Sequence, residues 1–275
     1  MKERQDFTLS RRTSDFRKAH AVDISGIGDR TVVLGNGFGT DKSFWRELTP
    51  WLEQRFRVVR FDWSVTPEHF DSVRYGSLDG YCDDLLAIVE TTGSKPCILI
   101  GHSMSAMIGM RAAKRERAFF ERIVMIAPAP CYVSHAGYPA GFSQNDIDAL
   151  LDRIGDDYVA WISAFAPVAV GDPQQQDVTD DFQSSLKAMR PDIALTMARL
   201  IFSMDMRAEL DGFDTPVTII QPDGDPVVPI AIGQFLAQRW PEARLEIIES
   251  VGHLPHLTAP QKVIEVLERA LAPTC

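Results

Sequence analysis

A serine stands in a sequence context that could activate it as a nucleophile. The motif Gly-His-Ser-Met-Ser covers residues 101–105, directly after an apolar run at 97–100 and directly before a helical pattern. A serine between a strand and a helix lies on a sharp turn, which requires small residues two positions before and after it. Gly101 and Ser105 meet that requirement, although glycine is more usual at the last position. The motif therefore predicts Ser103 as a nucleophile, and its strand and helix context argues against a chance match.

Ser103 needs a base, because a serine hydroxyl is a weak nucleophile at neutral pH. In proteins with this motif the chain order is serine, then acid, then histidine. His253 and His256 follow the last strand-like run. His253 comes directly after a glycine at the end of that run, where active-site loops of open sheets emerge, so we predict it as the base. We interpret His256 as a loop or pocket-rim residue.

The acid that orients the base should end the preceding strand, and this segment contains Asp223 and Asp225. Asp225 precedes the apolar loop at 226–229, which would hold it in place. Asp223 is adjacent to Gly224 and is typical of a turn. We therefore favour Asp225, while Asp223 stays open as the alternative because the position of the acid varies by a residue or two.

Acyl transfer also needs backbone donors for the oxyanion that develops on the substrate carbonyl. The expected donors are the amide of Met104, after the nucleophile, and that of Phe38, in the glycine-rich turn at 35–39. Such a turn could instead suggest dinucleotide binding. Its glycines lack the third position of that motif and no suitable acid ends the next strand, so this alternative is weak.

The elements that must position these residues alternate between strand and helix. Helical patterns separate short, β-branched apolar runs, which are typical of strands buried on both faces. The expected strands lie in residues 31–35, 56–63, 96–103, 122–130, 216–225 and 244–253, and the helical patterns in 43–54, 80–93, 105–116, 230–240 and 260–272. Such alternation predicts right-handed βαβ units and an α/β fold with a mostly parallel, doubly wound sheet.

The alternation is interrupted once, between about 131 and 212, where helical spacing continues without a strand. We therefore predict a hydrolase core formed by 19–130 and 213–275, with a helical lid at 131–212. Residues 1–18 are polar and aperiodic, so we expect a disordered tail. They contain no apolar run and no cleavage site of a secretory signal, which favours a cytoplasmic or nucleocytoplasmic protein.

The composition limits the class of protein. The chain has 275 residues, 28 Lys and Arg against 38 Asp and Glu, and a net charge of −10. This charge disfavours nucleic acid and anionic membranes as partners. Acids greatly outnumber bases between 131 and 182, which we interpret as a solvated surface rather than a docking face for a basic partner. The four cysteines have no metal-site spacing, so we expect free thiols, no metal and no cofactor.

A longer set of segments gives the chain a specific resemblance. These segments are GNGFGTDKSFW, FDW, GHSMSAMIGM, APAPCYV, AGF, FAPVAVGD, MRPDIAL, IFSMDMR and GHLPHL. They resemble the small α/β-hydrolases that include the bacterial stress regulator RsbQ and the plant karrikin and strigolactone receptors, with the karrikin-receptor branch most similar. The resemblance covers roughly residues 19–272. Asn36-Gly37 departs from the usual His-Gly, which we expect to alter hydrogen bonding near the oxyanion site.

The resemblance implies a V-shaped cap of four helices above an aromatic, apolar cavity that reaches the serine. The residues implied to line the cavity are Phe38, Tyr132, Phe142, Leu150, Trp161, Phe165, Phe182, Ile201, Phe202 and Val227.

Two functions are compatible with these residues. The first is hydrolysis of a small, apolar ester or butenolide lactone, slow and linked to ligand sensing, with Ser103, His253 and Asp225 as the catalytic triad. The second is a signalling receptor that binds such a ligand and contacts a protein partner through its lid. The resemblance suggests a phosphatase or an F-box protein as that partner. We expect a monomer in either case.

Overall fold

The computed structural model describes residues 13–63, 66, 68–240 and 242–272. Seven strands form one sheet in the order β1-β3-β2-β4-β5-β6-β7, and only β1 is antiparallel to its neighbour. The strands are β1 (Asp23–Ser25), β2 (Thr31–Gly35), β3 (Arg57–Arg60), β4 (Cys97–His102), β5 (Phe120–Ile126), β6 (Val217–Gly224) and β7 (Arg244–Val251).

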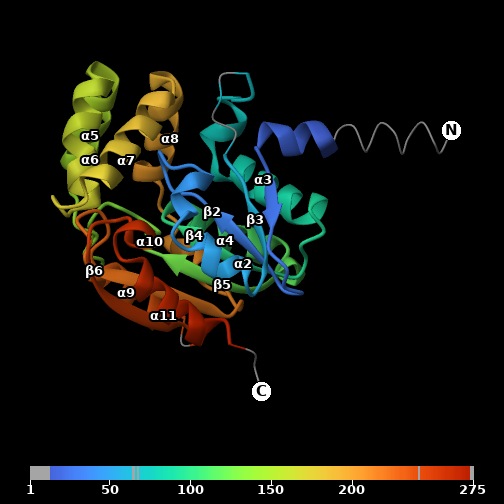
Figure 1. Ribbon diagram of the computed structural model, residues 1–275. Coiled ribbons are helices and arrows are strands. Elements are labelled where there is room, and N and C mark those ends of the chain that lie inside the picture. Colours follow the sequence, from blue (N-terminus) through green and yellow to red (C-terminus); the bar gives the residue numbers. More distant parts are fainter. Residues whose placement is uncertain (1–12, 64–65, 67, 241, 273–275) are drawn as a thin grey trace.

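Helices cover both faces of the sheet (Figure 1). Outside the lid, the longer helices are α3 (Leu78–Thr91), α4 (Met104–Arg115), α9 (Ile230–Arg239) and α11 (Pro260–Ala270). Shorter elements are η1 (Lys42–Trp45), α2 (Thr49–Glu53), η2 (Arg74–Gly76), η3 (Arg117–Phe119), η4 (Arg207–Glu209) and α10 (Pro255–Thr258). The segment 43–54, expected as one helix, is divided into η1 and α2, with Pro50 in the first turn of α2, where proline is tolerated.

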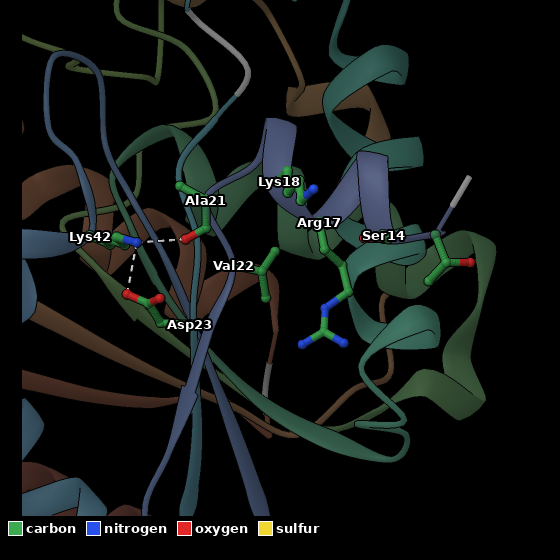
Figure 2. Close-up of a pocket in the computed structure, with 8 residues that line it drawn as sticks. Ser14, Arg17, Lys18, Ala21, Val22, Asp23 and Lys42 are labelled. Atoms are coloured by element: carbon green, nitrogen blue, oxygen red, sulfur yellow. Dashed lines mark hydrogen bonds and ion pairs between the residues drawn. The ribbon is translucent and has the colours of Figure 1, made fainter. Parts of the chain in front are cut away.

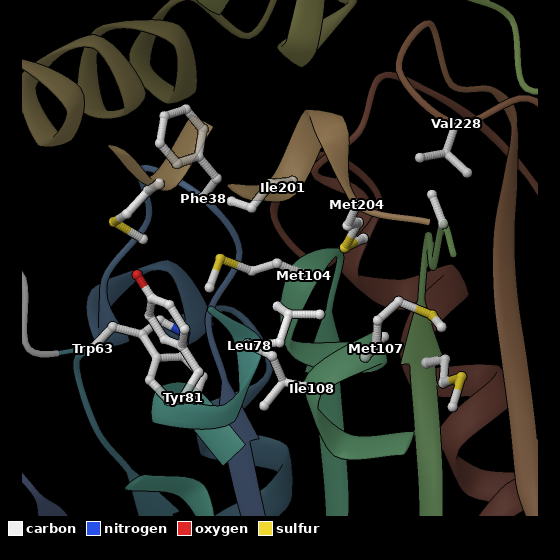
Figure 3. Close-up of a cluster of buried hydrophobic side chains, with 14 of the residues drawn as sticks. Phe38, Trp63, Leu78, Tyr81, Met104, Met107, Ile108, Ile201, Met204 and Val228 are labelled. Atoms are coloured by element: carbon white, nitrogen blue, oxygen red, sulfur yellow. The ribbon is translucent and has the colours of Figure 1, made fainter. Parts of the chain in front are cut away.

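Successive side chains of the strands point to opposite faces of the sheet and contribute to two separate apolar cores. Val33 and Leu99 point into the larger core, which α3, α4 and α9 cover, and Val32 and Ile98 point into the smaller one, which α11 covers. Both faces of β2 and β4 are buried, which explains their continuous apolar sequences. Figure 3 shows part of the larger core, where Met104 lies between the core helices and side chains of the lid.

Four helices form a lid over the carboxyl ends of the strands: α5 (Gln144–Asp156), α6 (Tyr158–Val170), α7 (Gln176–Ala188) and α8 (Pro191–Ser203). Helix α5 packs on α8, and α6 packs on α7. The lid also contacts the core closely at Gly39, where an added Cβ would lie 2.3 Å from Leu186. The division of the chain into a core at 19–130 and 213–275 and a lid at 131–212 remains a proposal.

The N-terminal part differs from its expectation where it is described. Residues 13–19 form a helix, whereas a disordered tail was expected through residue 18; residues 1–12 of that tail lie outside the described residues. Phe16 packs against the larger core and explains the order of this helix. Lys42 Nζ then fixes the following segment, because it donates to Ala21 O at 2.6 Å and pairs with Asp23 Oδ2 at 2.7 Å (Figure 2).

The sheet order and the helices confirm the predicted α/β fold with a mostly parallel sheet and an inserted helical cap. Among the described helices, none has the length and apolar character needed to cross a membrane. Cys82, Cys97 and Cys131 are buried free thiols. Cys275 lies outside the described residues.

Candidate active site

Ser103 lies on the turn between β4 and α4 with a strained backbone, at φ 52° and ψ −116°. Its amide donates to Ile126 O at 2.8 Å, which anchors the turn to the neighbouring strand β5. The turn is so tight that an added Cβ on Gly101 would lie only 2.8 Å from backbone atoms of Ser105 and Ala106. A non-glycine residue at this φ costs about 1–3 kcal/mol and persists only where the surrounding structure enforces it. This backbone conformation directs the Ser103 hydroxyl out of the turn, toward His253.

Ser103, His253 and Asp225 form a continuous hydrogen-bond chain. The distance from Ser103 Oγ to His253 Nε2 is 2.9 Å, and His253 Nδ1 lies 2.7 Å from Asp225 Oδ2. All three residues are buried. A carboxylate at Nδ1 favours the tautomer that carries its proton there, so Nε2 is free to accept the proton of the serine.

Asp225 is fixed from its other oxygen as well. Asp225 Oδ1 accepts from the amides of Val227 at 2.8 Å and Val228 at 3.0 Å, in the apolar loop that follows. Asp223, the alternative acid, points elsewhere: it is exposed and accepts from the amide of Ser250 at 2.9 Å. The geometry therefore joins Asp225, and not Asp223, to the histidine.

Two amides near Ser103 have no hydrogen-bond acceptor within the described residues, namely those of Phe38 and Met104. Met104 is the first residue of α4, so its amide belongs to the unpaired first turn of that helix. Phe38 follows the carboxyl end of β2, next to β4 in the sheet. Both amides are therefore available to a substrate oxygen.

An apolar pocket lies above Ser103. Seven of the ten expected lining residues line it, and His102, Ala169 and Leu254 were not expected: the full lining is Phe38, His102, Ser103, Tyr132, Phe165, Ala169, Phe182, Ile201, Phe202, Val227, His253 and Leu254. The space open to a water-sized sphere is only about 20 Å³. The pocket is therefore narrow in this position of the lid.

Three residues expected in the lining lie outside it. Trp161 stacks on Phe165, with ring centroids 4.8 Å apart, and its ring centroid lies 6.2 Å from that of Phe38. Leu150 is only partly buried on α5, which packs against α8 rather than over the serine. Phe142 precedes α5 and bridges to Val133. In this position of the lid the structure places these three residues beside the pocket rather than in its lining, and their place in the site stays a prediction.

Tyr132 contributes a polar group to this pocket. Burial raises the pKa of Tyr132 to about 12, an effect partly offset by a hydrogen bond with Ser103. Its ring is held edge-on against Phe202, with centroids 5.0 Å apart. The hydroxyl is therefore a neutral hydrogen-bonding group beside the serine at ordinary pH.

A column of buried histidines lies behind His253. His102 Nε2 is 2.8 Å from the backbone oxygen of His253, and His102 and His256 stack at 4.6 Å. His256 also stacks on Trp45 at 4.7 Å. The interpretation of His256 as a rim residue was therefore wrong, because α10 turns this side chain inward under the sheet edge. His102 carried a signal in the sequence, since it directly precedes the serine.

Burial makes this column sensitive to acid. It lowers the pKa of His256 to about 3 and that of His102 well below its ordinary value. Between pH 6.5 and 3 the unfolded chain binds more protons than the folded one, so the free energy of unfolding falls as the pH falls. Replacing His256→Phe, which keeps a ring against Trp45, should reduce this loss by about 1.4 kcal/mol per pH unit below pH 6. Urea unfolding of both proteins at pH 5 and 7 measures it; equal pH dependence would contradict the buried neutral state.

Asn36 connects the glycine-rich turn to its surroundings. Its side chain accepts from Trp45 Nε1 and donates to Phe61 O, both at 2.7 Å, and its backbone oxygen accepts from Trp63 Nε1 and Ser105 Oγ. The asparagine is 1% exposed, so all of these bonds are shielded from water. The departure from His-Gly thus places a fully bonded amide next to the Phe38 turn.

The loop that carries His253 is attached to the lid. His253 N donates to Ala169 O at the end of α6, at 2.7 Å. The two chains are in such close contact that an added Cβ on Gly252 would lie 2.0 Å from Val170 O, and one on Gly171 would lie 2.7 Å from Gly252 N. A movement of the end of α6 therefore acts directly on the backbone of the histidine.

This sheet order, with a serine at the strand-to-helix turn and an inserted helical lid, defines the class of α/β hydrolases. Residues 32–266 match the family model described as "Alpha/beta hydrolase family", and the chain belongs to that family. It is 39% identical over 261 residues to karrikin insensitive 2 receptor IA of Petunia hybrida, with 93% of this chain and 95% of the relative covered. A strigolactone esterase of Arabidopsis thaliana is 38% identical, with 91% and 95% covered. The resemblance to the karrikin and strigolactone branch is thereby confirmed.

A solved structure agrees with this assignment. A hydrolase from Oleispira antarctica superposes with a TM-score of 0.91 at 30% identity, with 95% of this chain and 98% of that chain covered. Its helical lid and sheet therefore have the same arrangement over nearly the whole chain.

Proposed function

We propose that the chain is a serine hydrolase that cleaves a small, apolar ester or butenolide lactone with Ser103, His253 and Asp225 as its triad. The observation that carries the proposal is the hydrogen-bond chain from Asp225 Oδ2 through His253 to Ser103 Oγ, at 2.7 and 2.9 Å, below an apolar pocket. The names of the relatives, a receptor of karrikin type and a strigolactone esterase, support a small ligand of this class.

In this mechanism Ser103 Oγ attacks the carbonyl carbon while His253 Nε2 takes the hydroxyl proton. The carbonyl electrons move onto oxygen, and the amides of Phe38 and Met104 stabilise the resulting charge. His253 returns the proton to the leaving oxygen, which leaves an acyl group on Ser103. A water molecule then repeats the attack with His253 as base, and the acid and the free serine are released. Neither step uses a cofactor.

The residues that line the pocket support an uncharged substrate. All the lid residues of the pocket are apolar or aromatic, and the described lining contains no side chain of Lys, Arg or Glu to pair with a charged ligand. A charged substrate would lose its hydration without compensation. We therefore expect uncharged esters and lactones to be favoured over their charged analogues.

Pre-steady-state kinetics with a small p-nitrophenyl ester test the mechanism. We expect a burst of nitrophenolate equal to the enzyme concentration, followed by slow turnover, because acylation precedes a slower release of the acyl group. A synthetic butenolide should compete for the same site and reduce the burst. A linear time course without a burst, together with no competition, would count against an acyl-enzyme on this chain.

One observation favours a second function, that of a ligand receptor. The pocket is narrow, with about 20 Å³ open to the centre of a water-sized sphere, so a bulky ester or lactone would displace lid side chains on entry. The end of α6 is bonded to His253 N, so that displacement and the state of the triad are linked. A ligand changes the lid only when it binds the two lid states with different affinity. In this function a protein partner would bind the lid in its new position.

Replacing Gly252→Ala tests the link between lid and histidine. The new Cβ would meet Val170 O and would also require the unfavourable φ of 83°. We expect at least an about ten-fold loss of ester hydrolysis at saturating substrate, because small displacements of catalytic groups have effects of this size. Gly212→Ala is the matched control: its φ is 73°, and nothing lies within 4 Å of its Cβ. Equal activity of both variants would show that the contact is irrelevant to catalysis.

A further inference from the structure

Three side chains of metal-binding type lie together outside the active site. Cys131, His135 and Asp205 each offer one ligand atom, and these atoms all lie within 4.8 Å of one another. Cys131 is buried, whereas His135 and Asp205 are exposed. An ion could therefore reach the thiol from the solvent side through the two exposed ligands. This group could not be predicted from sequence, because Asp205 is far from the other two residues along the chain.

The group lies where the chain crosses between the sheet and the lid. Cys131 follows β5 on the way into the lid, and Asp205 follows α8 on the way out. The two residues form an antiparallel bridge, and Met206 N donates to Pro130 O at 2.8 Å beside it. The two crossings are therefore adjacent, and any ion bound here would join them.

Each of the three residues has further contacts, through the backbone for Cys131 and His135 and through the side chain for Asp205. Tyr138 OH donates to Cys131 O at 2.8 Å, and the backbones of Tyr138 and His135 bond to each other at 2.9 Å in both directions. Arg207 donates to both oxygens of Asp205, at 2.8 and 2.6 Å. A carboxylate oxygen has more than one acceptor site, so this pairing leaves Asp205 able to bind an ion.

We propose that Cys131, His135 and Asp205 bind one thiophilic divalent cation of the Zn²⁺ type, which joins the entry and the exit of the lid. A thiolate, an imidazole and a carboxylate are ligands that Zn²⁺ accepts, with water in the fourth position. Tetrahedral Zn²⁺ would need these ligand atoms about 3.5 Å apart. The group must contract by about an ångström, which the exposed His135 and Asp205 side chains permit. On binding, the Cys131 thiol releases its proton to solvent and the sulfur forms the bond to the metal.

The bound ion would act on the lid rather than on the chemistry. It holds the two crossings together and does not touch Ser103, so it would limit lid opening independently of the triad. This site is separate from the proposed hydrolytic function, and Ser103→Ala should bind the ion as well as the unmodified chain does.

Cobalt is the probe that tests the site, because Co²⁺ bound to a thiolate gives a ligand-to-metal charge-transfer absorption. Titration of the full chain should give this absorption with saturation at one Co²⁺ per chain, and Zn²⁺ should abolish it by displacement. The absorption should disappear in Cys131→Ser and remain in Cys275→Ser. Its absence from the unmodified chain, or its survival in Cys131→Ser, would overturn the proposal.

The exposed ligands give a second test in variants that should fold normally. His135→Gln and Asp205→Asn should each weaken Co²⁺ binding at least about ten-fold. His69→Gln is the matched control for an exposed histidine elsewhere and should have no effect. Zn²⁺ should also slow amide hydrogen exchange in residues 130–135 and 204–207 of the unmodified chain, but not of Asp205→Asn. Equal binding by His135→Gln and His69→Gln, or unchanged exchange, would also overturn the proposal.

Discussion

Replacing Ser103→Ala should reduce kcat/KM for a p-nitrophenyl ester by at least about 10³-fold, because it removes the atom that forms the acyl bond. The burst should disappear with it. Alanine keeps the Cβ that already occupies the positive φ of 52° at the turn, so the fold should be retained. Steady-state and stopped-flow measurements of both proteins provide the test.

The controls for Ser103→Ala separate catalysis from binding and folding. Ser163→Ala removes an exposed hydroxyl on the lid helix α6 and should leave the rate unchanged. Ser103→Ala should still bind the butenolide, seen as a ligand-dependent rise in Tm, because the pocket lining remains. If Ser103→Ala hydrolyses the ester as fast as the unmodified chain, the nucleophile is a different group.

Replacing Asp225→Asn should lower kcat by about 10⁴-fold with little effect on stability. The asparagine oxygen can still accept from Val227 and Val228, as Asp225 Oδ1 does at 2.8 and 3.0 Å. Its NH₂ group would then face His253 Nδ1 and favour the tautomer with the proton on Nε2. In that tautomer the histidine cannot accept the proton of Ser103, so the base is lost while the geometry persists.

Asp223→Asn is the matched control for this change. Asp223 is exposed and its carboxylate binds Ser250 N, so the amide should preserve the contact and activity should change less than about three-fold. Steady-state rates of both variants at one pH, with Tm as the check on folding, decide between the two acids. A larger loss for Asp223→Asn than for Asp225→Asn would reverse the assignment of the acid.

The parts of the fold that could be predicted from sequence are those with a buried, repetitive pattern. The run 31–35 is strand β2 with the expected bounds, and the other parallel strands agree within a few residues. Strand β1 was missed because Asp23, Ile24 and Ser25 are only three residues at the sheet edge, with no two-sided burial to require an apolar sequence. The helix at 13–19 was missed because its stability comes from the packing of Phe16, which a polar local sequence does not reveal.

The proposed triad was easier to predict from sequence than the lining of the pocket around it. Ser103, Asp225 and His253 each follow the carboxyl end of a strand within two residues, so this edge of the sheet brings them together from distant parts of the chain. The lid residues depend on how helices pack on one another, which spacing alone does not determine. Trp161 shows this: it has the expected helical position and stacks on Phe165, yet it is not part of the pocket lining.

Contacts made by backbone atoms could not be predicted from the sequence. The bond from His253 N to Ala169 O needs no particular side chain, and its only trace is the pair of glycines at 171 and 252 that allow the close approach. The cluster of Cys131, His135 and Asp205 was missed for a related reason, since the bridge between the two lid crossings brings them together. Both features concern the attachment of the lid to the core.

Covalent labelling is the most direct test that Ser103 is an activated nucleophile. A fluorophosphonate probe reacts with a serine only when a base such as His253 takes its proton. Intact-mass analysis should show one label per chain, and peptide mapping should find it on Ser103. Labelling should be lost in Ser103→Ala and greatly slowed in Asp225→Asn. A label on another residue, or equal labelling of Ser103→Ala, would contradict the proposed triad.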